Sequence, residues 1–221
     1  NKAQNGGQFR DAMKLWDVPS QNFVYADVDG NIGYQFPGNI PVRAKGDGTV
    51  PVEGWTGENE WTGFVPFEQL PSRYNPPEGF IVTANNAVVD DASPVMLMKR
   101  DWDFGYRARR ITDLLLAKDK LSVDDIKAVH FDSYSIFADE LLPLVFESVP
   151  AKSGGTIDAA MAELRAWDKR YTRESRGALL FEMLRLKLAQ AVFGDELGEL
   201  SADAIGVGTV TWTALRNMMR D

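Results

Sequence analysis

The chain has 221 residues, with 24 Lys and Arg against 32 Asp and Glu, and a formal net charge of −8. This acidic balance, without any Lys- or Arg-rich run, argues against nucleic acids and anionic membranes as partners. The absence of cysteine excludes disulfides, thiolate metal sites and a cysteine nucleophile, and no apolar run reaches the roughly 18 residues of a membrane span.

The sequence changes character near residue 100. Residues 1–98 are rich in Gly, Pro and aromatic residues and predict an irregular β-rich portion. Residues 99–221 carry Leu, Ala, Arg and Glu at helical spacing and predict a helical portion. The expected fold class is therefore α+β, with these two portions in sequence.

The first portion is expected to begin with a short helix over 8–16. A β-hairpin follows, with strands over 22–27 and 32–36 joined by a tight Asp-Gly-Asn turn. Residues 37–78 predict irregular chain with short strands, and 79–84 predict the next clear strand. The aromatic side chains of the irregular part are expected to be buried: Trp55, Trp61, Phe64, Phe67 and Tyr74.

Helices are expected in the second portion because apolar residues recur three to four positions apart. Ser122 and Asp125 have the spacing of a capping box, which predicts the start of a helix. Residues 175–193 are apolar on most faces, which is typical of a helix buried in a bundle. The other expected helices cover 106–117, 138–149, 159–171 and 201–221.

Several familiar kinds of site are absent. His130 is the only histidine and no Gly-x-Ser-x-Gly elbow exists, so a Ser-His-Asp triad is not expected. Residues 27–31 mimic the start of a calcium loop. Ile32 and Gly38 stand where that loop needs a glycine and a bidentate glutamate, which favours a hairpin turn. Neither a zinc-spaced His/Cys cluster nor a phosphate-binding Gly-rich loop is present.

Asn85 and Asn86 follow directly on the apolar segment 79–84. Polar amides at the end of an apolar strand are costly unless something binds them. A side-chain N–H at this place can be one donor of an oxyanion hole, which stabilises the negative oxygen formed when an amide carbonyl is attacked. The alternative, which spacing alone favours, is a turn in which the side chain bonds nearby backbone.

A combination of motifs runs through nearly the whole chain in a recognisable order. The matching stretches are residues 22–34, 61–68, 74–86, 106–111, 131–135, 141–143 and 166–168. Together they resemble the large chain of the penicillin acylase (penicillin amidase) family, whose members are N-terminal-nucleophile hydrolases. The chain is thus expected to form only part of the four-layer sandwich of that fold.

The resemblance implies an exported enzyme, periplasmic or secreted, made as a precursor that cuts itself to free a serine. The α-amino group of that serine is the base for its hydroxyl, so no histidine is needed. The implied partners are a small-molecule acyl-amide substrate and the remaining segments or small chain of the processed precursor. No cofactor is implied for catalysis. A structural calcium ion is allowed, although Asp90 and Asp91 do not match its ligand pattern cleanly.

The resemblance also assigns roles to individual residues. Asn85 falls at the side-chain oxyanion donor of the family and Asn86 supports it. Arg107 falls at an arginine that orders the active site or contacts substrate, with Arg109 and Arg110 as neighbouring alternatives. Residue 1 is Asn rather than the nucleophilic Ser, and the chain is expected to be an interior part of the enzyme that is inert by itself.

Two rival interpretations stay open at this stage. The chain could be a non-catalytic binding module whose Trp- and Tyr-rich loops hold an acyl chain or peptide. It could also belong to an acylase homologue that lost activity. The enzyme interpretation expects the Asn85 amide to point into a cleft near Arg107, whereas the binding interpretation expects it to close a turn.

Overall fold

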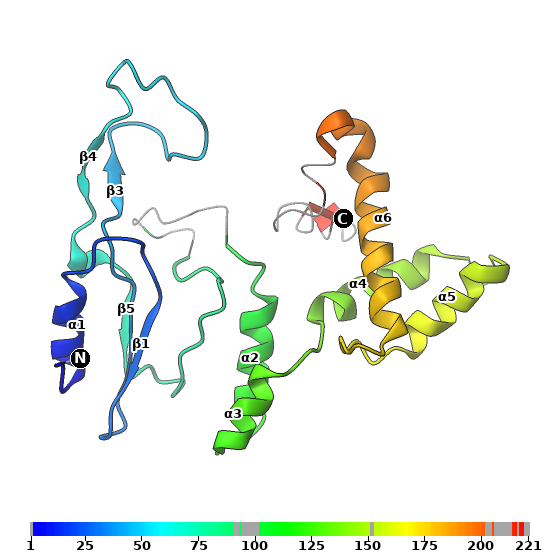
Figure 1. The fold of residues 1–221 in the computed structure, drawn as a ribbon, viewed down its shortest axis with the longest axis horizontal. Helices are drawn as coiled ribbons and strands as arrows, with labels where there is room; N and C mark the ends of the chain where they lie inside the picture. Colours follow the sequence, from blue (N-terminus) through cyan, green and yellow to red (C-terminus); the bar gives the residue numbers. More distant parts are fainter. Residues whose placement is uncertain are drawn as a thin grey trace. The chain divides into compact units, whose positions relative to one another are not determined.

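The computed structural model describes residues 2–90, 93, 102–150, 153–201, 205, 214–215 and 217–218. The chain forms two compact units, Asn1–Arg100 and Asp101–Asp221. All strands of the described part lie in the first unit, and the long helices lie in the second (Figure 1). The α+β class is therefore confirmed. The predicted boundary at residue 98 lies outside the described residues.

The first unit is built on a three-stranded antiparallel sheet of order β1-β2-β5. It contains β1 (Phe23–Ala26), β2 (Ile32–Gln35) and β5 (Ser72–Tyr74), so the predicted hairpin is confirmed. α1 (Gly6–Met13) packs on this sheet, where Phe9 stacks on Tyr25 at a ring distance of 5.3 Å. The remaining elements are β3 (Pro41–Arg43), its antiparallel partner β4 (Trp61–Phe64), and the short helix η1 (Phe67–Gln69).

The hairpin turn is held by the side chain of Asp27. Its Oδ1 accepts hydrogen bonds from the backbone N–H of Asn31 at 2.8 Å and of Asp29 at 3.1 Å. Gly30 has φ of 85°, a left-handed conformation that glycine adopts without strain. The carboxylate that mimics a calcium ligand in the sequence thus closes the turn.

Two expectations for the first unit are wrong. Residues 79–84 form no strand, because no strand in the described part of the chain pairs with them. The aromatic residues expected to be buried are largely exposed, with Trp55 83% and Trp61 59% exposed. All residues of β4 are exposed. Phe64 and Tyr74 are also exposed, whereas Phe67 is half-buried.

The second unit is helical. α3 begins after Ser122, whose capping box with Asp125 is confirmed. The helix expected over 159–171 ends at Ala166, because Trp167 turns into extended backbone with ψ of 132°. Most of the helix expected over 201–221 lies outside the described residues. The helices are α2 (Tyr106–Leu116), α3 (Val123–His130), α4 (Ile136–Ser148), α5 (Gly155–Ala166), α6 (Arg176–Leu197) and the short η2 (Gly198–Leu200).

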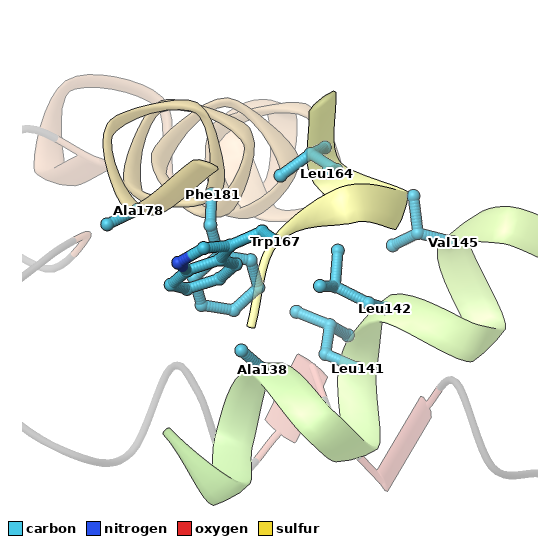
Figure 2. Close-up of a cluster of buried hydrophobic side chains, with 8 residues drawn as sticks. All are labelled: Ala138, Leu141, Leu142, Val145, Leu164, Trp167, Ala178 and Phe181. Carbon is cyan, nitrogen blue, oxygen red and sulfur yellow. The ribbon is translucent and has the colours of Figure 1, made fainter. Parts of the chain in front are cut away.

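The core of this unit lies between α4, α5 and α6 (Figure 2). Phe181 of α6 is fully buried, and its ring lies beside that of Trp167 at 5.6 Å. Side chains of α4, Leu141 and Leu142 among them, face these two rings (Figure 2). The buried cluster consists of Ala138, Leu141, Leu142, Val145, Leu164, Trp167, Ala178 and Phe181.

Gly177 lets α6 approach Trp167 closely. A Cβ added at Gly177 would lie 2.4 Å from Cγ of Trp167, and the indole cannot easily retreat because its Nε1 donates to the Arg170 carbonyl at 2.9 Å. We expect Gly177→Ala to lower the free energy of unfolding by about 1–3 kcal/mol through overpacking.

The matched control for this substitution is Gly194→Ala in the same helix. The nearest atom to its added Cβ is Cγ of Gln190, at 3.9 Å. Here alanine should raise stability by about 0.5–1 kcal/mol, because it restricts the unfolded chain. Urea unfolding of both variants measures the difference, and equal shifts of the same sign would contradict the packing argument.

Candidate active site

The first candidate residue, Asn85, lies in the irregular segment of the first unit. Its φ is 61°, in the left-handed region, and the residue is exposed. Asparagine tolerates this conformation better than most residues with a Cβ. The preceding residue, Ala84, is buried, and its packing fixes the backbone directly before Asn85.

The neighbouring amide, Asn86, makes the local turn. Its Oδ1 accepts from the backbone N–H of Ala84 at 3.0 Å, and its Nδ2 donates to the carbonyl of Ala87 at 3.1 Å. Asn86 thus forms the turn, with its side chain bonded to nearby backbone, that the sequence offers as the alternative to an oxyanion donor. The two asparagines therefore differ in surroundings: the side chain of Asn86 braces the turn on which Asn85 is carried.

The second candidate residue, Arg107, lies in the first turn of α2 in the second unit. The helix starts after Gly105, whose φ of 81° requires the freedom of glycine. Arg107 Nη2 lies 3.2 Å from Oδ2 of Asp103, and the side chain is 58% exposed. Such an exposed pair contributes little to stability.

The two alternative arginines are engaged in different ways. Arg109 Nη1 pairs with Oε1 of Glu140 on α4 at 3.0 Å. Arg110 forms a bidentate pair with Asp132, with Nε at 2.7 Å from Oδ2 and Nη2 at 3.0 Å from Oδ1. A bidentate contact with a nearly buried carboxylate is typical of a structural role. Arg110 is therefore held in place, whereas the side chains of Arg107 and Arg109 are 58% and 60% exposed.

Arg107 and Arg110 both line a cavity of about 640 Å³ within the second unit. Its wall is largely apolar, and His130, the last residue of α3, lies on it. A cavity with an apolar wall and a few charged groups is the usual form of a small-molecule site. The other lining residues are Tyr106, Ile111, Leu114, Val129, Asp132, Ser133, Tyr134, Ser135, Ile136, Phe137, Tyr171, Glu182 and Arg185.

Asp132 was not predicted as a site residue, although it belongs to a matching stretch. Its side chain is 9% exposed and accepts from Arg110 and from Nη1 of Arg170 at 2.9 Å. The hydrogen bonds from Arg110, with a smaller contribution from Arg170, hold the pKa of the Asp132 carboxyl well below its usual range. Partners 22 and 38 residues away leave no local signal in the sequence.

A calcium site does not fit the described residues. They contain no group of three or more His, Cys, Asp or Glu side chains that could hold a metal ion. Asp90 is exposed, and Asp91 lies outside the described residues. In the same part of the chain, no helix combines the length and apolar character needed to cross a membrane.

Comparison with known proteins finds similarity between this α+β chain and proteins named as acylases. The family model for penicillin amidase matches residues 1–221. The chain is 36% identical over 190 residues to penicillin acylase 2 proenzyme of Pseudomonas sp. strain SE83, covering 86% of this chain and 24% of that protein. It is 30% identical over 216 residues to acyl-homoserine lactone acylase QuiP of Pseudomonas fluorescens, covering 92% and 26%.

A solved structure agrees with these matches. Thermostable penicillin G acylase from Alcaligenes faecalis matches with a TM-score of 0.74 and 28% identity, over 90% of this chain and 37% of that chain. The chain belongs to the penicillin amidase family. It spans about a quarter of the length of the two curated relatives above.

Proposed function

We propose that the chain is part of the large chain of an amide hydrolase that removes an acyl group from an amide. The observation that carries this proposal is the match of the penicillin amidase family model to residues 1–221. The nucleophile is an N-terminal serine outside these residues, activated by its own α-amino group. The hydroxyl attacks the amide carbonyl, the amine leaves with the proton, and water hydrolyses the acyl-enzyme.

In this proposal, Asn85 donates its side-chain N–H to the oxygen that becomes negative during attack. The left-handed backbone and the exposure of Asn85 support the role, since a donor must reach beyond its own turn. Arg107 orders the site or holds a carbonyl or carboxylate of the substrate. Its exposed guanidinium at the edge of the 640 Å³ cavity supports that role.

The substrate class is an acyl amide, since relatives are named as acylases of penicillin and of acyl-homoserine lactones. The remaining partners are the other segments or small chain of a processed precursor, and one relative is named a proenzyme. We further propose an exported, periplasmic or secreted enzyme. Catalysis by a serine and its amino group requires no cofactor.

A second candidate function is a binding module that uses exposed aromatic side chains. The observation that favours it is the exposure of Trp61 and Phe64 on β4, where the two rings pack edge-on at 6.1 Å. Arg43 lies over the Trp61 ring at 5.9 Å. Such a surface suits a peptide or acyl chain. An acylase homologue that has lost activity also stays open.

Turnover separates these functions. We expect the full-length gene product, once processed, to hydrolyse a chromogenic phenylacetyl or long-acyl amide, and the isolated 221-residue chain to give no turnover. The physical reason is that the serine is the nucleophile. The Asn85 amide and the Arg107 guanidinium only donate hydrogen bonds and cannot attack a carbonyl. Release of the chromophore measures the rate. Turnover by the isolated chain would place the nucleophile within it, and an inert processed product would favour the binding module or the inactive homologue.

A further inference from the structure

Three segments far apart in the sequence converge on one carboxylate in the second unit. Asp132 follows α3, and it accepts two hydrogen bonds from Arg110 of α2 and one from Arg170, which lies between α5 and α6. Its remaining bond comes from the backbone N–H of Tyr134 at 3.3 Å. A carboxylate that is 9% exposed and accepts hydrogen bonds from two guanidinium groups has little freedom to move.

The two loops that carry Asp132 and Arg170 are themselves joined through their backbones. Tyr134 and Arg170 form an antiparallel bridge. Ser135 N–H donates to the Lys169 carbonyl at 2.9 Å, and Tyr171 N–H donates to the Ser133 carbonyl at 3.0 Å. These bonds make the loops a single platform, because each loop limits the conformations of the other.

The ring of Tyr134 completes this platform. Arg110 lies over the ring with Cζ 4.7 Å from its centroid, and Arg170 lies at 5.8 Å. A guanidinium group is attracted to the face of an aromatic ring, and this attraction acts in addition to the ion pair with the carboxylate. The platform thus binds Arg110 by a bidentate ion pair and by a ring contact.

This contact bears on the position of α2, whose residues are exposed or only partly buried. None of the side chains of α2 is fully buried. The helix also contacts α4: the Tyr106 hydroxyl donates to Glu140 at 2.8 Å, Arg109 pairs with Glu140 at 3.0 Å, and the Tyr106 ring lies 5.7 Å from that of Phe137. Arg107 and Arg110 are three residues apart, so they lie on neighbouring parts of one helix face, and both line the same cavity.

We propose that Asp132 is a positioning residue: by holding Arg110 against the paired loops, it sets where α2 presents Arg107. The inference rests on the proposed function, since it assigns Asp132 an effect on catalysis through Arg107. A displacement of about 1 Å in a group that orders an active site lowers the rate by up to about 100-fold. A residue of purely structural importance would lower stability without changing the rate of the folded enzyme.

The test is a double-mutant cycle in the complete processed enzyme, with kcat and KM for amide hydrolysis measured well below the unfolding temperature. We expect Asp132→Asn to lower kcat about 10- to 100-fold. Arg107→Gln should lower it as well. In the Arg107→Gln background, Asp132→Asn should have almost no further effect on kcat, since residues that act as one unit are not additive.

Asp158→Asn is the matched control, because it removes an Asp carboxylate of the second unit from α5 rather than from the platform. Asp158 Oδ1 accepts from the backbone N–H of Ser153 at 2.9 Å. We expect this variant to keep the parent kcat. If Asp132→Asn fails to fold, Arg110→Lys takes its place, since lysine keeps the charge and loses the bidentate geometry.

The outcomes separate the two proposals. Additive effects of Asp132→Asn and Arg107→Gln, or a parent-like kcat for Asp132→Asn, would overturn the positioning role and leave the role of Arg107 intact. An equal loss of kcat in Asp158→Asn would also overturn it. A parent-like kcat for Arg107→Gln would overturn the proposed role of Arg107 and the positioning role together.

Discussion

Replacing Asn85 by glycine in the complete processed enzyme should lower kcat about 100- to 1,000-fold, the usual cost of losing one oxyanion donor. Glycine is the informative substitution because the φ of Asn85 is 61°, where alanine would add backbone strain. The Michaelis constant should change little, since the hydrogen bond is strongest in the transition state. Steady-state hydrolysis of a chromogenic amide measures both constants.

Asn75→Gly is a matched control for this experiment. Asn75 also has a positive φ, 46°, and lies in the same unit. Its side chain braces the hairpin, with Oδ1 accepting from Ile32 N–H at 2.9 Å and Nδ2 donating to Asn31 Oδ1 at 2.8 Å. This variant should lose stability and keep kcat. If Asn85→Gly behaves in the same way, Asn85 is a turn residue and the oxyanion role is wrong.

Elements with a local chemical signal were predictable from the sequence. The hairpin follows from alternating residues around Asp-Gly-Asn, and Asp27 closes its turn through bonds of short range. The capping box of Ser122 and Asp125 lies within four residues. The family itself was predictable because its motifs occur in order along the chain. Each motif alone is weak evidence for the family, but the ordered set is strong evidence.

Features that depend on distant partners were not predictable. Residues 79–84 are predicted as a strand from their apolar character, but a strand also needs a neighbour, and the described chain offers none. The exposure of Trp55 and Trp61 likewise depends on what covers the ribbon. The Asp132 cluster arises from three segments that no spacing rule relates. Propensity describes the local chain, whereas these features are set by packing and long-range contacts.

The largest expected loss of stability comes from Phe181→Ala, which should lower the free energy of unfolding of the chain by about 3–5 kcal/mol. Phe181 is fully buried, and its ring contacts those of Trp167 at 5.6 Å and Phe137 at 6.0 Å. Alanine would leave a cavity that these rings cannot fill, since the Trp167 indole is hydrogen-bonded to the Arg170 carbonyl.

Leu179→Ala is the control on the same helix, because Leu179 is 66% exposed and should cost less than about 0.5 kcal/mol. Denaturant unfolding followed by circular dichroism measures both variants. Because Arg170 belongs to the platform that holds Arg110, a loosened Trp167 should also weaken the contact of Asp132 with Arg170. Equal stabilities of the two variants would mean that α6 is not anchored through Phe181, and that the Asp132 platform is supported by other contacts.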